Sequence, residues 1–395
     1  MDRRVLFATL VLALAVVLGA GTVFFAFVEP PDMTRQPTVE WESASVGNVT
    51  DGASMATVTV ENGSRVAVPT AGEDCGVRVL DGDGHVAWSW NASDCSGSAG
   101  SAGSGGASHP VAAGMLGGDP VVAIVDGDSV RVFDAVSGDE RFVYELSAPA
   151  TVAPTFGDVS GTNQSSLVTV SSSGTVHVVG ADGRTVWTAD SGGEAPLAPV
   201  TGNLTGGAGA EVLVGTTGDD PTLTAFGAGG EERWSRSLDT APAGLSAPRT
   251  TVGSTVILTD DAGSVHRLSA TDGETIWSVP LQDDALTVGG VGSGLVRVAG
   301  GGNVWAVGLV DGSIVWKQQF GGSGETLQPL TAGATTETVV VTRGGEISAI
   351  DGNGKVVSSG SVDATVVDNV VSADRGGLPT VLLLTEDGRI IAVSP

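Results

Sequence analysis

The sequence predicts an all-β protein, a ring-shaped β-propeller built from four-stranded antiparallel blades. Short apolar runs alternate with glycine-rich turns, and a turn glycine is followed four residues later by an aromatic residue in unit after unit. Successive aromatic positions are 54, 45, 47, 43, 39 and 42 residues apart. A period of about 40 to 50 residues that carries only strand signals is typical of propeller blades.

The stretch from Ser264 to Leu281 shows the unit most clearly. Asp272-Gly273 separates two short apolar runs, and Asp-Gly readily adopts the positive φ of tight hairpin turns. The corresponding pairs are Gly84/Trp88, Gly138/Phe142, Gly183/Trp187, Gly230/Trp234, Gly273/Trp277, Gly312/Trp316 and Gly354/Ser358. A β-sandwich lacks a tryptophan at fixed period and solenoid repeats are usually shorter, which favours the propeller.

The two ends of the chain suggest how the ring closes. After Ser358 the sequence offers three more strands, within 362–393, and ends before a fourth. Thr38 to Ser43 is a strand without a hairpin partner, and its Trp41 lies 47 residues before Trp88. Joining both ends completes an eighth blade and removes an exposed sheet edge. We therefore predict eight blades, with seven as the alternative.

The repeats SATDGETIW, AVGLVDGSIVW, VGADGRTVW and FGAGGEERW resemble the pyrroloquinoline-quinone-like (PQQ-like) propeller repeat, Ala-x-Asp-x-x-Thr-Gly-x-x-x-Trp. The resemblance covers about residues 39–395. That family includes quinoprotein alcohol dehydrogenases and the propeller lipoprotein of bacterial outer-membrane assembly. It implies that the repeat tryptophans pack between adjacent blades as structural residues. These are Trp41, Trp88, Trp187, Trp234, Trp277 and Trp316.

The amino-terminal residues predict a membrane anchor. Residues 1–4 are basic, 5–28 contain no charge, and 29–38 form a proline-rich tether before the propeller at 39–395. A 24-residue helix is about 36 Å long, enough for a hydrocarbon core of about 30 Å. We predict an uncleaved transmembrane signal anchor, with a cleaved signal peptide as the alternative. Arg3 and Arg4 place the amino terminus in the cytoplasm and the propeller outside a single-pass cell membrane protein.

The cysteines and the sequons agree with an extracytoplasmic propeller. Cys75 and Cys95 are the only cysteines, and in an exported chain we expect them to form a disulfide at the rim of one blade. Residues 96–108 are a flexible Gly/Ser loop within the ring. Five sequons predict possible glycosylation sites. They are Asn48, Asn62, Asn91, Asn163 and Asn203.

The composition is strongly acidic. The formal net charge is −27 over 395 residues, and Lys317 and Lys355 are the only lysines. Such a surface is typical of proteins from salt-loving microbes, because molar salt shortens the screening length to about 3 Å. Together with the sequons and the anchor it suggests a halophilic archaeon. The same charge argues against nucleic acid as a partner.

Two segments, 157–168 and 202–213, resemble the integrin-type FG-GAP calcium loop. The resemblance implies Asp158, Ser160, Thr162 and Ser166 as ligands in the first loop, and Asn203, Thr205 and Glu211 in the second. Each loop keeps at most one carboxylate, which makes a poor site for a hard cation. Asp158, Asn203 and Glu211 are therefore weak calcium candidates, and the alternative is a relic loop that joins two strands.

Position in the repeat gives the remaining candidates. Prolines recur where we expect the chain to begin each inner strand, around the central channel where propellers commonly bind partners. The polar residues beside them, His109, Arg249 and Gln328, are the predicted channel-mouth site. His177 and His266 share one repeat position in the third strand of their blades, where packing between blades is the favoured interpretation.

The predicted function is a membrane-anchored scaffold that binds a partner protein of the cell envelope. A quinone-dependent dehydrogenase is the first alternative, and a carbohydrate- or envelope-binding receptor is the second. Adjacent cysteines, HExxH, GxSxG and His/Cys metal spacings are absent from the sequence. We therefore predict no enzyme activity and no cofactor, with PQQ and Ca²⁺ as the alternative.

Overall fold

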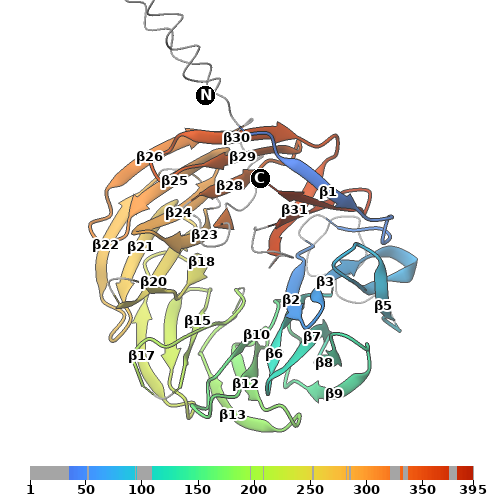
Figure 1. Ribbon diagram of the computed structural model, residues 1–395. Coiled ribbons are helices and arrows are strands. Elements are labelled where there is room, and N and C mark those ends of the chain that lie inside the picture. The colour runs from blue at the N-terminus through green and yellow to red at the C-terminus, as the bar shows by residue number, and fades with distance from the viewer. Residues whose placement is uncertain are drawn as a thin grey trace, which may run out of the picture. The chain divides into compact units, whose positions relative to one another are not determined.

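The computed structural model describes residues 35–395 except 51–52, 94, 96–108, 196, 208, 251–252, 282, 284–285, 321–329, 332–336, 373–379 and 395. In these residues eight antiparallel sheets follow one another around a ring (Figure 1). The predicted eight-bladed propeller of four-stranded blades is confirmed. The predicted anchor at 5–28 and the loop at 96–108 lie outside the described residues. Within the described residues, no helix has the length and apolar character needed to cross a membrane.

The strands of each blade are called a to d from the channel to the rim. The first blade contains β2 (Ala56–Val60), β3 (Gly63–Thr70), β4 (Gly76–Leu80) and β5 (Val86–Asn91), with the short helix η1 (Gly72–Asp74). The second contains β6 (Val111–Leu116), β7 (Asp119–Asp126), β8 (Ser129–Asp134) and β9 (Glu140–Glu145). The third contains β10 (Thr155–Gly157), β11 (Ser166–Val170), β12 (Thr175–Val179) and β13 (Thr185–Asp190). The fourth contains β14 (Val200–Gly202), β15 (Glu211–Gly215), β16 (Thr222–Phe226) and β17 (Glu232–Ser237).

The second half of the ring repeats the pattern. The fifth blade contains β18 (Pro242–Ser246), β20 (Gly253–Asp260), β21 (Ser264–Ser269) and β22 (Thr275–Pro280), and the short β19 (Arg249–Thr250) also pairs with β20. The sixth contains β23 (Thr287–Gly292), β24 (Leu295–Gly300), β25 (Asn303–Gly308) and β26 (Ile314–Gln319). The seventh contains β27 (Leu330–Thr331), β28 (Thr338–Val341), β29 (Glu346–Ile350) and β30 (Val356–Ser361).

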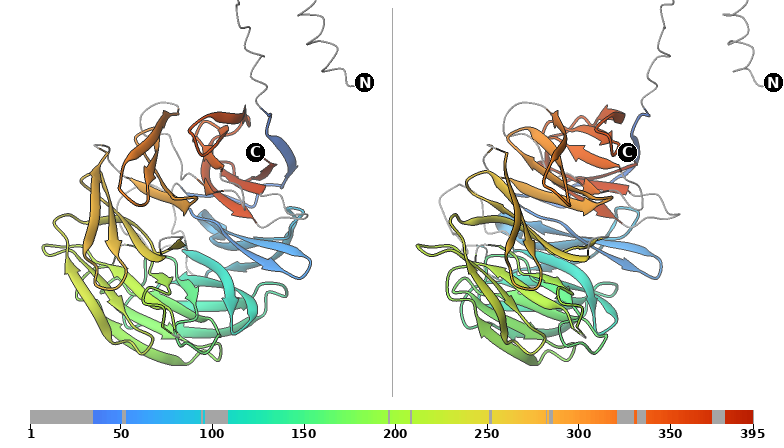
Figure 2. Two further views of the ribbon diagram at one scale, coloured as in Figure 1. Left: turned by 60° about the vertical axis from the view of Figure 1, so that its left-hand side comes forward. Right: turned by 90° about the vertical axis from the view of Figure 1, so that its left-hand side faces the viewer.

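The eighth blade is made from both ends of the described chain. It contains β31 (Val366–Ser372), β32 (Thr380–Thr385), β33 (Ile390–Ser394) and, as its outer strand, β1 (Thr38–Glu42). β1 and β33 are antiparallel and pair from Thr38 with Ser394 to Glu42 with Ile391. The ring is therefore closed by the strand that the sequence left without a partner. Figure 2 shows the closed ring from two further directions.

The repeat aromatic residues lie between blades, each against the turn glycine of the next blade. A Cβ atom added at Gly273 would lie 2.7 Å from the ring of Trp234, and one at Gly354 would lie 2.7 Å from the ring of Trp316. Both glycines also have a positive φ, so a side chain is excluded on two grounds. The indole N–H groups of Trp88, Trp187, Trp234 and Trp277 donate to carbonyl oxygens in the next blade at 3.0, 3.0, 3.1 and 3.0 Å.

One β-bulge recurs in the outer hairpin of all eight blades, immediately before the aromatic position. For example, Trp187 pairs with Val178 and Thr185 with Val179, so Val186 is left without a partner in the register. We call the bulged residue the bulge position. It is occupied in ring order by Glu40, Ala87, Arg141, Val186, Arg233, Ile276, Val315 and Val357. Because a bulge turns its residue out of the ladder, the aromatic side chain can face the neighbouring blade.

The disulfide and the core stabilise the ring. Cys75 and Cys95 are bonded, as predicted, and their Cα atoms lie 5.7 Å apart. Closing a loop of 20 residues contributes about 3 kcal/mol in the chain-entropy estimate. The core consists of clusters that join neighbouring blades, such as Ile257 and Val265 of the fifth with Val296 and Trp305 of the sixth.

Low salt is expected to weaken this fold. At a formal net charge of −27, dilution lengthens the screening distance from about 3 Å at 1 M to about 30 Å at 0.01 M salt, so repulsion between surface carboxylates grows. We expect the melting temperature to fall steadily as salt is diluted. Calorimetry in sodium chloride over that range measures it, and a constant melting temperature would contradict the prediction.

Candidate functional site

The wall of the central channel is almost uncharged. Among the described inner strands β2, β6, β10, β14, β18, β23, β27 and β31, only Asp368 carries a charge. Its carboxylate accepts a hydrogen bond from the Met55 amide at 2.6 Å. In a protein with a formal net charge of −27, the described inner strands are thus nearly free of acidic residues. The described inner strands contain no second ionisable residue.

His109 does not lie open at the channel mouth, contrary to the prediction. It precedes the inner strand β6 as expected, but its side chain is only 6% exposed. The ring packs edge-on against Trp90 of the preceding blade, with centroids 5.2 Å apart. Its Nδ1 lies 3.1 Å from the Val125 carbonyl oxygen. His109 therefore belongs to the interface between the first two blades.

Arg249 lies at the opposite end of the ring. The inner strand of the fifth blade begins at Pro242, so Pro248 and Arg249 follow that strand instead of starting it. In an antiparallel blade the a–b loops and c–d turns lie at one end, while the b–c turns and d–a connections lie at the other. Arg249 is exposed at the a–b end, whereas His109 belongs to the d–a end. The third predicted residue, Gln328, is outside the described residues.

The two FG-GAP-like loops are a–b loops of neighbouring blades. In each of them the acidic residue accepts hydrogen bonds from backbone amides of the same loop. The Asp158 carboxylate accepts hydrogen bonds from the amides of Thr162 and Asn163 at 3.1 and 2.9 Å. Glu211 is buried, accepts from the Leu204 amide at 2.8 Å and also from the Thr205 hydroxyl. The acids thus hold the loop backbones in place. Within the described residues no cluster of three His, Cys, Asp or Glu side chains could hold a metal ion.

Contacts join these loops into one continuous surface. The Ala210 amide of the second loop donates to the Asp158 carbonyl oxygen of the first at 2.8 Å. The Ser254 hydroxyl of the fifth blade donates to the Asn203 carbonyl oxygen. We call the described residues of loops 158–165 and 203–210, with Arg249 to Ser254, the a–b loop band. It is polar, spans three blades and offers exposed side chains such as Thr162, Asn163 and Arg249.

The two histidines at one repeat position have different surroundings. His177 lies between the Tyr144 hydroxyl of the preceding blade, 3.2 Å from Nδ1, and Ser147, and burial lowers the pKa of its imidazole. His266 instead pairs its Nε2 with Asp260 at 2.8 Å. Asp260 also accepts from the Ser264 amide at 2.7 Å. In other blades the hydroxyls of Ser171, Thr342 and Thr385 accept a hydrogen bond from the equivalent turn amide. The main structural role of Asp260 is therefore to cap this turn.

Asp260 makes the stability of the fifth blade sensitive to acid. Burial alone would raise the pKa of Asp260, but hydrogen bonds from His266, Ser264 and Thr240 together lower it. Because the folded-state pKa lies below the unfolded value of about 3.9, the ionised carboxylate stabilises the fold above that pH. This contribution is lost as pH falls through the folded pKa.

We therefore expect Asp260→Asn to lower the melting temperature at neutral pH and to flatten its decline on the acid side. Thermal unfolding of both proteins between about pH 7 and about pH 3 tests this. If the melting temperatures of Asp260→Asn and of the unchanged protein fell in parallel with pH, the pKa of Asp260 would not differ between the folded and unfolded states. Asp182→Asn, at an exposed c–d turn, is the control.

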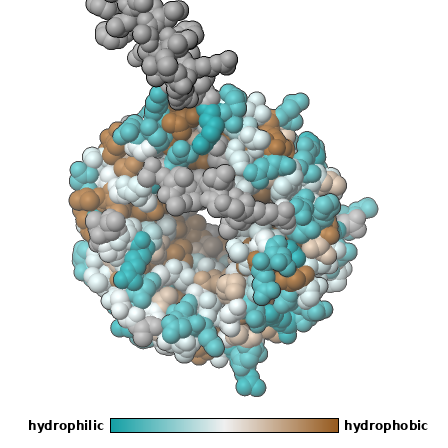
Figure 3. Space-filling view, viewed as in Figure 1, coloured by the Kyte–Doolittle hydropathy of each residue, from teal (hydrophilic) through white to brown (hydrophobic). Residues whose placement is uncertain are grey.

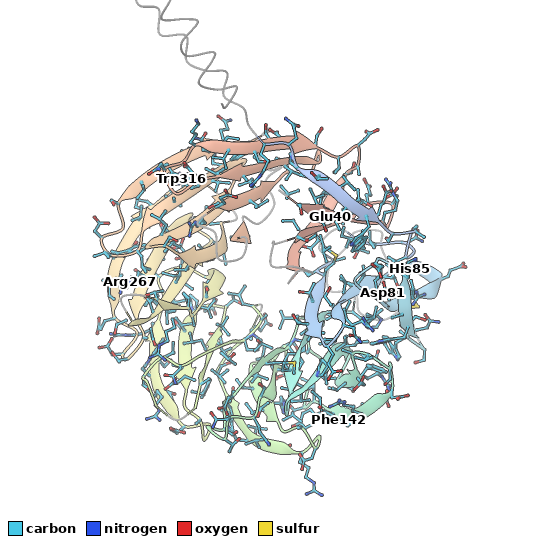
Figure 4. The ribbon with its side chains drawn as sticks, viewed as in Figure 1. Glu40, Asp81, His85, Phe142, Arg267 and Trp316 are labelled. Atoms are coloured by element: carbon cyan, nitrogen blue, oxygen red, sulfur yellow. A yellow bond between two sulfur atoms is a disulfide. The ribbon has the colours of Figure 1, made fainter. Side chains whose placement is uncertain are left out.

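Sequence reasoning missed two buried arginines. The Arg267 guanidinium donates to Thr255 and to the Leu309 carbonyl oxygen of the next blade, both at 3.0 Å, and burial lowers its pKa. That carbonyl also accepts from the Trp277 indole, so Arg267 helps to hold two blades together. Figure 4 labels Arg267 in the ring. Arg297 is 1% exposed and donates to Thr338 in the seventh blade. Alternation along a strand marks which residues share a face, but not which face is buried.

A closed ring of eight blades, docked by aromatic residues over turn glycines, defines a propeller of the PQQ-like class. The family model described as outer membrane protein assembly factor BamB matches residues 172–301 and 219–395, so the chain belongs to this family. Among curated proteins, none matches the sequence.

Solved structures show the same fold at low identity. BamB from Moraxella catarrhalis is 19% identical with a TM-score of 0.61, and the match covers 91% of this chain and 98% of that one. BBS1N, solved in complex with ARL6DN, is 15% identical with a TM-score of 0.55, over 91% and 97% of the chains. A quinohemoprotein alcohol dehydrogenase from Pseudomonas putida is 11% identical with a TM-score of 0.62, over 92% and 77%. These similarities establish the fold alone.

Proposed function

We propose that the protein is a non-enzymatic scaffold, anchored in the cell membrane by residues 5–28, whose propeller binds a partner protein outside the cytoplasm. The a–b loop band carries this proposal. It is a polar surface fixed by internal hydrogen bonds, it spans three blades, and it lies at one end of the ring. Membership of an assembly-factor family agrees with a role in holding other proteins.

A rigid loop surface suits protein recognition. Loops fixed before binding lose little conformational entropy when a partner docks, and Asp158 and Glu211 hold these loops from within. Exposed Thr162 and Asn163 can then offer a hydroxyl and an amide, and Arg249 a charge, at constant positions. The guanidinium of Arg249 favours a partner that presents carbonyl or carboxylate groups to this surface.

Crosslinking in native membranes tests the site. A photo-reactive residue at Thr162 should give one adduct of fixed mass with a partner protein. The same residue at Arg184, an exposed position on the c–d turn of the third blade, is the matched control. Equal adducts at both positions, or none at Thr162, would contradict the proposed site. Alkaline extraction that releases the full chain from membranes would contradict the anchor.

The alternatives give different results. Tight, stoichiometric uptake of PQQ with Ca²⁺, followed by oxidation of an alcohol or a sugar, would support a quinone-dependent dehydrogenase. The dehydrogenase neighbour shares the fold and makes this assay worthwhile. Specific binding to a glycan array at high salt would support a carbohydrate receptor instead. We expect neither signal, and an unchanged absorption spectrum after quinone is added.

A further inference from the structure

Three consecutive blades present an apolar residue at the bulge position. These residues are Ile276, Val315 and Val357 in the fifth, sixth and seventh blades. Ile276 and Val315 are 49% and 51% exposed, and the neighbouring Val310 and Ile314 are 65% and 50% exposed. In the other blades the position carries a charge or a single isolated apolar residue: Val186 stands between blades with Arg141 and Arg233. Figure 3 shows hydrophobic residues at this part of the rim, over β22 and β26.

The same outer strands lack acids. β22, β26 and β30 contain no Asp or Glu, whereas β1, β9, β13 and β17 each contain at least one. β5 also lacks acids, but it lies between the acidic β1 and β9. In a chain with 45 acidic residues, three neighbouring outer strands without one form a distinct sector. We call Ile276, Val310, Ile314, Val315, Lys317 and Lys355 the rim patch.

The patch also holds both lysines of the chain. Lys317 is exposed, and its Nζ lies 4.9 Å from the centre of the Trp305 ring, so its stem follows apolar surface. Lys355 is exposed and directly precedes β30. The nearest turn acids face their own turns: Asp311 accepts from Ser313, and Asp351 accepts from the amides of Asn353 and Lys355. The patch therefore combines exposed aliphatic side chains with two lysines, and the carboxylates of Asp311 and Asp351 lie in the turns at its border.

The chain enters the propeller beside this patch. The Arg35 amide donates to the Val357 carbonyl oxygen at 2.9 Å, and the Ser359 amide donates to the Arg35 carbonyl oxygen at 3.1 Å, so residue 35 is fixed on the outer edge of β30. The uncharged stretch ends at Val28. Seven residues span at most about 25 Å when fully extended. An anchored chain must therefore keep the outer edge of the seventh blade within that distance of the membrane.

We propose that the rim patch contacts the surface of a membrane that contains anionic lipids, so that the propeller stands with this edge toward the bilayer. This inference rests on the anchor in the proposed function. Exposed aliphatic side chains beside lysines fit the boundary between lipid headgroups and acyl chains. Several exposed aliphatic residues in neighbouring blades of a highly charged protein suit an interaction surface, and the short tether indicates that the membrane is the surface they meet. The a–b loop band, at one end of the ring, stays open to a partner.

Depth-dependent quenching in vesicles tests the contact. The full chain is reconstituted in vesicles made of phosphatidylcholine and phosphatidylglycerol in equal parts, with spin-labelled lipid added. A single environment-sensitive fluorophore is attached to Val315→Cys, and in a second protein to Val186→Cys. Both valines occupy the bulge position with similar exposure, 51% and 46%, and the disulfide leaves no other thiol. We expect several-fold stronger quenching and a blue shift at position 315 only.

Each outcome has a distinct meaning. Equal quenching at both positions overturns the rim contact while leaving the anchor intact, provided that the protein floats with the vesicles in a density gradient. Failure to float overturns the anchor and the contact together. A blue shift without quenching by labelled lipid means that another protein copy covers the patch, which overturns the lipid assignment.

The anionic component has its own test. The double variant Lys317→Gln, Lys355→Gln should still float with the vesicles. Its quenching at position 315 should fall to the level found in vesicles of phosphatidylcholine alone. Unchanged quenching in the anionic vesicles would overturn the role of the lysines. Arg184→Gln, at an exposed site outside the patch, should leave the quenching unchanged.

Discussion

Removing β1 is expected to destroy the stable fold. β1 completes the eighth blade by pairing with β33, and its Trp41 ring lies against Gly84 of the first blade, where an added Cβ would be 2.6 Å away. The Ser43 amide and hydroxyl also bond to the backbone of Ile390. Loss of a packed tryptophan alone typically costs about 3 to 5 kcal/mol, from a total of about 5 to 15 kcal/mol.

Two shortened chains test this at high salt. One begins at Ala44 and lacks β1, and the other begins at Gln36 and keeps it. The first should aggregate or melt far below the second in calorimetry and size-exclusion chromatography. Trp41→Ala should give an intermediate loss, and Thr38→Ala, at the exposed start of β1, almost none. Two equally stable monomers would show that the ring does not depend on this closure.

The blade count and the closure could be predicted because their signals are local and periodic. A turn glycine and an aromatic residue four positions later are both needed in every blade, as Gly273 and Trp234 show, so they recur at the period of the blade. The cysteines could be paired because the chain has only two. None of these inferences required knowledge of which blades face one another.

The prediction of the channel-mouth residues depended on signals that are neither local nor periodic. A proline fits both the first residue of a strand and a loop, so Pro242 and Pro248 look alike in the sequence although only Pro242 begins β18. The side chain of His109 packs against Trp90, which belongs to the preceding blade. Orientation of this kind depends on contacts between blades, and a repeat pattern carries no information about them.

Ser358 is a departure from the repeat that the structure explains. Every other outer strand has an aromatic residue at this position, and that residue lies against the c–d turn of the next blade. The eighth blade has no c–d turn, because its c strand is β33 and its d strand is β1. The segment from Arg35 to Pro37 fills that place, and a Cβ at Gly360 would lie 2.8 Å from Pro37. No space for an aromatic ring remains above Ser358, which is 0% exposed.

Restoring the repeat tryptophan should therefore harm the protein. From the sequence alone, Ser358→Trp would be expected to stabilise it by completing the pattern. In the structure the indole would have to displace the Arg35 segment, which bonds to Val357 and Ser359. Overpacking by fewer atoms typically costs about 1 to 3 kcal/mol, so we expect a loss of at least about 3 kcal/mol in denaturant unfolding.

Ser358→Ala is the matched control for this experiment. The buried Ser358 hydroxyl has no hydrogen-bond partner among the described residues. Leaving such a group unsatisfied costs about 1 to 3 kcal/mol, so its removal should leave stability unchanged or raise it. A more stable Ser358→Trp protein would mean that the Arg35 segment moves aside at little cost. The ring would then be held at its junction by β1 and β33 alone.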